Sequence, residues 1–203
     1  MVIHAERAHV GEAGASAGST IFDGDRLSTE GGGLLRLAGP GLNLQLAEGS
    51  QMVLRRAPAP EGISGDRVEV ELTAGTLVLS AAPMREISVL ANDAWFRAAS
   101  HSATVAHLRI VNRQELRVYA QRGLLQLSYH GDSETIQEGA AYRVLLDPST
   151  KEISAISETN EFNKKGTRLH RTFRLVAIGV AAGVAIPVLI HELESPDRPG
   201  FKP

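Results

Sequence analysis

The chain has 203 residues, of which 43% are hydrophobic but only 4% aromatic, and its formal net charge is −2. This length is enough for one domain with a self-sufficient core plus an appendage, and the core has to be built mainly from Leu, Val, Ile and Ala. The near-neutral charge gives no indication of a nucleic-acid partner. The absence of cysteine excludes disulfides, thiolate metal sites, a catalytic cysteine and a lipid-modified cysteine.

Residues 1–148 have the pattern of an all-β domain. Leucines alternate with other residues over 35–37 and 42–46, on both sides of a Gly39-Pro40-Gly41 break, which predicts a hairpin with one buried face. The alternation recurs over 68–72, where Ala74-Gly75 then predicts a turn into another strand. Further strands are expected at Thr76–Leu79, Ile87–Leu90, Val105–Val111, Leu116–Ala120, Leu124–Tyr129 and Tyr142–Leu146. Short strands with no helical pattern between them predict a small jelly-roll or β-sandwich-like domain of antiparallel strands.

Two zones of different composition follow this domain. Residues 149–172 are charged and polar and hold too little apolar surface to offset the entropy of ordering, so a flexible linker is expected. The sixteen residues Leu175–Ile190 carry no charge and, extended by Phe173 and a snorkelling Arg174, approach the roughly 17–20 residues that cross a bilayer core. A single C-terminal transmembrane helix over 173–191 is therefore expected, before a Pro-rich tail at 192–203. A buried helix of a soluble protein is the alternative, although such a helix usually keeps a polar face.

Two features of the apolar segment bear on assembly and orientation. Gly179 and Gly183 have the G-x-x-x-G spacing that lets two helices approach closely, so a homodimer through the helix is one hypothesis and chance occurrence the other. Basic residues precede the segment and mostly acidic residues follow it, so the positive-inside rule places the β-domain in the cytoplasm. The N-terminal residues lack a signal-peptide pattern, which agrees with that orientation.

Five short motifs occur in the order found in the FecR-like domain family. The segment Gly18-Ser19-Thr20-Ile21-Phe22-Asp23-Gly24-Asp25-Arg26-Leu27-Ser28-Thr29 resembles the family's opening motif, "G-x-x-L-x-x-G-D-x-I-x-T". Four later segments are similar to the strand after that motif, to the "x-x-G-x-L" turn, to the "G-x-V-x-V" strand and to the "L-x-x-G-x-x-x-x-V" ending: Gly32–Leu37, Thr73–Leu77, Gln121–Leu127 and Ile136–Val144. The resemblance covers roughly residues 10–146, and its specificity comes from the order of the motifs.

The resemblance implies a short-stranded β-domain with a regulatory role. The family takes its name from a regulator of iron-citrate uptake that passes a signal from an outer-membrane transporter to a sigma factor, and whose domain lies in the periplasm. In that regulator the membrane helix precedes the domain, whereas here the apolar segment follows it. FecR-like domains also occur in proteins of unknown role, which this chain resembles more. On location, the resemblance favours the periplasm and the charges around the apolar segment favour the cytoplasm.

The opening motif also has a physical explanation of its own. Asp23-Gly24-Asp25 predicts a tight turn in which Gly24 has a positive φ and the aspartates accept hydrogen bonds from nearby backbone N–H groups. With Gly18, these residues are expected to be structural. A calcium loop is the alternative, and it would need further oxygen ligands at set spacing.

No residue is predicted to be catalytic, to bind a cofactor or to bind a metal. The seven histidines form no H-x-H or H-E-x-x-H motif, and His101 and His107 would lie about 20 Å apart on one strand. Glu69 and Glu71 share a strand face but are interpreted as solvated residues. Trp95-Phe96 beside Arg97 is interpreted as a packing anchor, with a recognition patch as the alternative.

These observations predict a membrane-anchored, non-catalytic binding, scaffolding or signalling module that presents a FecR-like β-domain to a protein partner. No cofactor and no nucleic acid is expected. The first alternative is an exported envelope protein that binds peptidoglycan or polysaccharide. The second is a jelly-roll enzyme with a metal in its pocket.

Overall fold

The structure, a computed structural model, describes residues 1–57, 67–98, 101–147 and 172–178. These residues form fifteen β-strands. The strands are β1 (Val2–Val10), β2 (Ala13–Gly14), β3 (Arg26–Gly39), β4 (Leu42–Leu46), β5 (Gln51–Ala57), β6 (Arg67–Ala74), β7 (Thr76–Ala81), β8 (Ile87–Ala91), β9 (Ala94–Ala98), β10 (Thr104–Asn112), β11 (Glu115–Arg122), β12 (Leu125–Tyr129), β13 (Asp132–Ile136), β14 (Ala141–Leu146) and β15 (Phe173–Ala177). The predicted all-β class is confirmed for this part of the chain.

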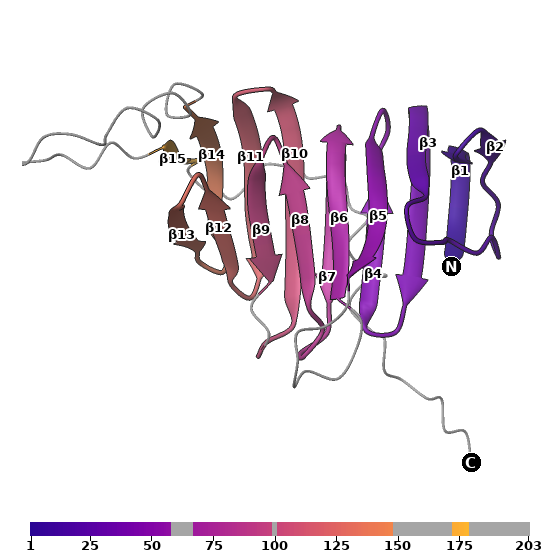
Figure 1. Ribbon diagram of the computed structural model, residues 1–203, viewed down its shortest axis with the longest axis horizontal. Coiled ribbons are helices and arrows are strands. Elements are labelled where there is room, and N and C mark those ends of the chain that lie inside the picture. The colour runs from indigo at the N-terminus through magenta and orange to yellow at the C-terminus, as the bar shows by residue number, and fades with distance from the viewer. Residues whose placement is uncertain (58–66, 99–100, 148–171, 179–203) are drawn as a thin grey trace, which may run out of the picture.

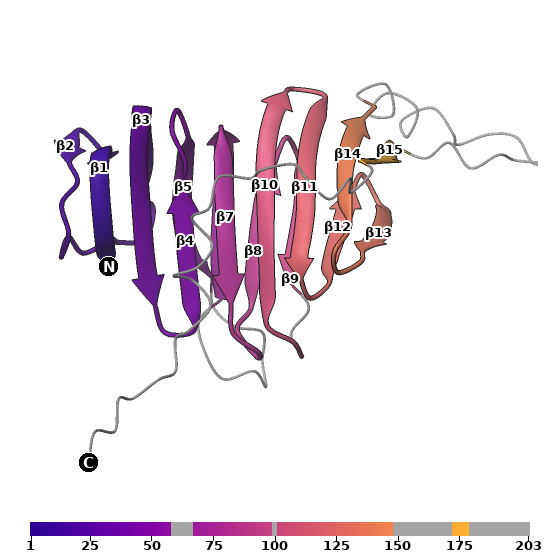
Figure 2. The same ribbon diagram turned by 180° about the vertical axis from the view of Figure 1, so that it is seen from behind.

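One continuous hydrogen-bonded sheet folds over itself into two layers (Figures 1 and 2). The first layer contains, in spatial order, β13, β12, β9, β8, β6, β5 and the start of β3, and the second contains the rest of β3, then β4, β7, β10, β11, β14 and β15. Strand β3 belongs to both layers, because Arg26–Ser28 pairs with β5 while Leu35–Gly39 pairs with β4. Among the described pairs all are antiparallel except β6 with β8.

The core lies between the two layers and is formed by alternate residues of most strands. Large side chains with under 2% exposure include many leucines but few aromatics, as the composition predicts: Phe96, Phe173, Leu27, Leu35, Leu46, Met52, Leu72, Leu77, Leu79, Leu108, Leu116 and Leu125. The predicted hairpin is confirmed, since Leu35↔Leu46 and Leu37↔Leu44 are paired across a Pro40-Gly41 loop. Glycine at position 41 supplies the positive φ of +66° that this two-residue loop needs.

The chain crosses between the layers at Gly75, where a turn is expected from the sequence, and again at Gly123. Strand β6 pairs with β5 and β8, whereas β7, which is separated from β6 by Gly75 alone, pairs with β4 and β10. Gly75 makes this crossing at φ +80°, and a Cβ added there would lie 2.5 Å from the Cα of Ser50. Gly123 makes the same kind of crossing between β11 and β12, at φ +73°. Only glycine fits both the backbone conformation and the space at these positions.

The start of the expected transmembrane helix is instead strand β15. Residues Phe173–Ala177 pair antiparallel with β14, and the Phe173 side chain is 1% exposed in the core. The physical reason is a period of two in the sequence, because Phe173 and Leu175 point inward while Arg174 and Val176 are exposed. Thr172, expected to end the flexible linker, is 4% exposed.

The rest of the expected C-terminal organisation lies outside the described residues. That part includes the linker up to residue 171, the helix from residue 179, the Gly179 and Gly183 pair, and the tail. Among the described residues, no helix has the length and apolar character needed to cross a bilayer.

Candidate binding surface

Hydrogen bonds join the predicted turn Asp23-Gly24-Asp25 to the neighbouring strand β5. The backbone N–H of Phe22 donates to Oδ2 of Asp25 at 2.7 Å, and that of Arg56 donates to Oδ1 of Asp23 at 2.6 Å. Gly24 has φ +83°, and its N–H donates to the Leu54 carbonyl at 2.8 Å. Both aspartates therefore accept bonds from backbone N–H groups in this arrangement, which stabilises the turn. Gly18, with φ +91°, donates to the carbonyl of Val2.

The other residues singled out in the sequence lie apart from one another. Glu69 and Glu71 lie on the outer face of the first layer, where Glu71 is 3.2 Å from Arg55. Trp95 is half-buried on that same outer face, while its neighbour Phe96 is in the core. Among the described residues, no three His, Cys, Asp or Glu side chains lie close enough together to hold a metal ion.

Three arginines lie side by side on the outer face of the second layer. Arg109 of β10 is directly opposite Arg117 of β11, and Arg117 is directly opposite Arg143 of β14. All three side chains are exposed, because the residues that alternate with them, such as Leu108 and Leu116, fill the core. We call Arg109, Arg117 and Arg143 the arginine row. Its members are 8 and 26 residues apart in sequence, so only strand register brings them together.

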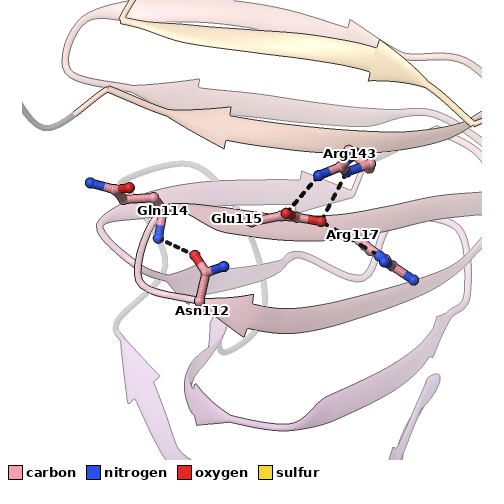
Figure 3. A network of polar contacts seen from close by, with 5 residues as sticks. All are labelled: Asn112, Gln114, Glu115, Arg117 and Arg143. Carbon is pink, nitrogen blue, oxygen red and sulfur yellow. Dashed lines mark hydrogen bonds and ion pairs between the residues drawn. The ribbon is translucent and has the colours of Figure 1, made fainter.

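One carboxylate, Glu115, lies beside the arginine row (Figure 3). It accepts two hydrogen bonds from Arg143, at 2.9 Å and 2.8 Å, and lies 3.7 Å from Arg117. The bidentate bonds from Arg143 and the positive charges of both arginines lower the pKa of Glu115, although partial burial of the carboxylate opposes the shift. The carboxylate stays ionised to lower pH than usual, and it balances only one of the three positive charges.

His107 lies on the same outer face as the arginine row. Its Nε2 is 3.1 Å from Oε1 of Gln121, and its ring is 5.7 Å from that of Tyr119 on the neighbouring strand. Burial lowers the pKa of His107, and the hydrogen bond with Gln121 partly offsets this effect. The imidazole is therefore a neutral packing group at neutral pH. His101, by contrast, is exposed in the turn before β10.

The last strand, β15, borders the arginine row and forms one end of the sheet order. Val176 is directly opposite Arg143 and is 43% exposed, and Ile178 after the strand is 36% exposed. The other end of the strand is anchored by Thr172, whose N–H donates to Oδ2 of Asp132 at 2.7 Å. The Thr172 hydroxyl shares its proton between that carboxylate and the Tyr129 carbonyl. This anchor joins the second layer to the β12–β13 hairpin of the first.

An apolar recess of about 270 Å³ opens at the end of the sandwich near the β3–β4 hairpin. Leu37, Leu44 and Leu54 form much of its lining, and Arg56 and Arg85 supply charge. No signal in the sequence indicated this recess, because its lining comes from the ends of strands in both layers.

No protein-family model matches the chain, and no curated protein matches it. Among solved structures, two crystal structures of a candidate anti-sigma factor from Parabacteroides distasonis ATCC 8503, at 1.65 Å and 2.50 Å resolution, are similar to it. Each has a TM-score of 0.46 and 13% sequence identity, and covers 59% of this chain. The chain spans about half the length of these structures, 54% of each.

Proposed function

We propose that this protein is a FecR-like, non-catalytic binding module that is held at a membrane and binds a protein partner by strand addition to β15. The observation that carries the proposal is the outer edge of β15, which pairs with β14 alone among the described strands. The partner contributes an extended segment whose alternate residues are apolar, so that it continues the inward and outward alternation of β15.

The backbone groups available for strand addition follow from the register. Asp147 donates to the carbonyl of Thr172, and Ile178 donates to that of Ala141. Because bonded positions alternate in an antiparallel pair, Arg174 and Val176 also bond toward β14. The N–H and C=O groups of the alternating residues, including Leu175 and Ala177, point away from β14 and are available to a partner strand.

The strands at the two ends of the main strand order, β13 and β15, differ in composition. The opposite end of the sheet order, β13, carries Asp132 and Glu134, and charged residues on an edge discourage pairing with another chain. Strand β15 carries one charge, Arg174, and is otherwise apolar. An apolar edge next to exposed Val176 and Ile178 favours association.

Membrane attachment through the apolar segment is the second part of the proposal. The expected span over 173–191 and strand β15 share the five residues Phe173–Ala177, so they exclude each other. With β15 in the sheet, residues 178–190 remain, which are thirteen residues and fewer than the roughly 20 needed to cross the bilayer. We therefore expect this segment to enter the membrane from one side, directly after the strand.

A proline at the edge of β15 tests strand addition. In Ala177→Pro the lost N–H is one that points away from β14, so the ladder to β14 is retained while a partner strand loses a donor. Ala177→Ser is the matched control, because it changes the side chain and keeps the N–H. The full chain, solubilised from native membranes, is expected to retain a stoichiometric partner with serine and to lose it with proline.

Two results would count against this function. Equal recovery of the partner by both variants would show that the partner binds elsewhere on the domain. Repeated purification without any stoichiometric partner, from cells grown under several conditions, would remove the binding module itself.

A further inference from the structure

We propose that the arginine row docks the outer face of the second layer on an anionic bilayer surface. The proposal rests on the membrane attachment described above and adds which face of the domain meets the lipid. It concerns the sheet face, whereas the partner strand would occupy the edge of β15.

The row is not explained by the stability of the sheet. Like charges directly opposite each other on neighbouring strands are destabilising, and here two such pairs, Arg109 with Arg117 and Arg117 with Arg143, follow one another. On the outer face of the first layer, by contrast, Arg55 is directly opposite Glu69. Three positive charges in register are instead suited to a flat surface of negative charge.

The chemistry of the row suits phosphate groups. Neighbouring strands are about 4.8 Å apart, so three arginines on consecutive strands extend over roughly 10 Å of a flat face. A guanidinium group donates in a fork that matches phosphate oxygens. The side chains of Arg117 and Arg143 are 52% and 45% exposed, and no ion pair of Arg109 is found within the described ranges. Nε and Nη2 of Arg143 already donate to Glu115, so Arg143 offers only its remaining N–H groups to phosphate.

The row borders β15, and the apolar residues of the C-terminal segment follow β15 in the sequence, which favours a membrane as the partner of this face. Val176 continues the line of the row onto β15, opposite Arg143, and the apolar residues 178–190 begin two residues later. A surface that places basic side chains beside exposed Val176 and Ile178 combines electrostatic attraction to anionic lipid with burial of apolar area. Neither a free phosphate nor a nucleic acid would use the apolar part.

Flotation of the full chain with vesicles tests the proposal. One set of vesicles is phosphatidylcholine, and in the other part of it is replaced by phosphatidylglycerol. Each arginine near an anionic surface contributes about a fivefold increase in affinity, so Arg109→Gln with Arg117→Gln should weaken binding to anionic vesicles about 25-fold. Arg26→Gln with Arg97→Gln is the matched control, because both are exposed on the outer face of the first layer, and it should bind like the wild type.

A variant expected to strengthen binding completes the test, because misfolding would not increase affinity for anionic vesicles. Glu115→Gln removes the carboxylate beside the row, and it should strengthen binding to anionic vesicles several-fold while leaving binding to phosphatidylcholine unchanged. Added salt should reduce the difference between the two vesicle types.

The outcomes separate this proposal from the function above. Equal binding of wild type to both vesicle types would overturn the arginine-row proposal and leave membrane attachment intact. No binding to either type would overturn both. Binding of an acidic polypeptide with the same dependence on Arg109 and Arg117, without preference for anionic vesicles, would assign the face to an acidic protein and overturn the lipid proposal.

Discussion

The carboxylate of Glu138 accepts a hydrogen bond from the backbone N–H of Gly123, at 2.8 Å. Gly123 is the residue at which the chain crosses from the second layer to the first, and Glu138 lies in the turn between β13 and β14. The N–H of the next residue, Gly139, donates to the Ala120 carbonyl at 2.7 Å. The turn that contains Glu138 and Gly139 therefore bonds both to the crossing residue Gly123 and to Ala120 in the strand before it.

The same pair of hydrogen bonds, one to a Glu side chain and one from the N–H of the Gly after it, occurs where β3 passes between the layers. Glu48 Oε2 accepts a bond from the N–H of Gly32 at 2.8 Å, and Gly49 donates to the carbonyl of Glu30 at 3.1 Å. At the third crossing a serine replaces the glutamate, since Ser50 Oγ accepts from the N–H of Thr76 beside Gly75. A Glu-Gly turn that binds a crossing glycine is therefore a repeated element of this fold.

Removal of the Glu138 carboxylate should destabilise the domain. Glu138→Ala leaves the partly buried N–H of Gly123 without its charged acceptor, which costs about 1–2 kcal/mol of unfolding free energy. Denaturant-induced unfolding measures the change. Glu12→Ala, at an exposed position in the β1–β2 turn, is the control and should change the free energy by less than about 0.5 kcal/mol. Equal effects of the two substitutions would show that the bond contributes nothing.

Two glycines with nearly the same backbone conformation separate conformational cost from steric cost. Gly139 has φ +75° and open space where a Cβ would lie, whereas Gly123 has φ +73° and a Cβ there would lie 2.6 Å from the Ala103 carbonyl oxygen. Gly139→Ala should therefore cost about 1–2 kcal/mol for the left-handed conformation alone. Gly123→Ala should cost an additional 1–3 kcal/mol or so for the overlap with backbone. Urea unfolding of both variants checks the order, and equal costs would contradict the layer crossing.

His107 should make the domain less stable in mild acid. Because burial lowers its pKa in the folded state below the ordinary 6.5, the unfolded chain binds more protons as the pH falls below about 6.5, and stability falls with it. His107→Gln cannot take up this proton. Its unfolding free energy should therefore decrease less than that of the wild type between about pH 7.5 and pH 5.5. His101→Gln, at an exposed position, is the control and should follow the wild-type profile.

The alternation of apolar residues was sufficient to predict many strands but not their layer. Leu35 to Leu46 gave a correct hairpin, because both of its strands are half-buried and joined by a short turn. The turn at Gly75 was placed correctly, but the strands it joins belong to opposite layers, which depends on pairing with strands distant in sequence. Strands β1, β2, β5, β9 and β13 were not predicted. The sequence of β13, Asp132–Ile136, is polar because the strand is at an edge, and it lacks a clear alternation.

The C-terminal strand and the arginine row escaped detection for different reasons. Hydropathy summed over a long window has the same value whether Phe173–Ala177 forms a strand or part of a helix. The alternation with a period of two covers only these five residues, which is too few to distinguish it from the apolar stretch that follows. The arginines of the row are conspicuous only after β10, β11 and β14 are aligned. Strands β10 and β11 are consecutive, and the register of such a hairpin follows from its turn, but β14 pairs with β11 from farther along the chain, so the pattern along the sequence does not bring Arg143 to the row.

Substitution of Phe173 distinguishes a strand from a lipid-embedded segment. With its side chain 1% exposed between the layers, Phe173→Ala should lower the unfolding free energy of the domain by about 3–5 kcal/mol, because it removes a large buried ring and leaves a cavity. Val176→Ala, in the same strand but 43% exposed, should change it by less than about 0.5 kcal/mol. The measurement is denaturant-induced unfolding of the detergent-solubilised full chain, followed by the fluorescence of Trp95.

The contrast between the two substitutions carries the result. A residue in lipid would not contribute to the stability of the sandwich. Near-identical free energies for Phe173→Ala, Val176→Ala and the wild type would therefore place residues 173–177 in the membrane and remove β15 as a binding edge.

A third variant, Thr172→Val, tests the same strand through the hydrogen bonds of the residue that precedes it. It removes the hydroxyl that bonds to Tyr129 and Asp132, and it should cost about 1–3 kcal/mol because both acceptors lose a donor at a buried position.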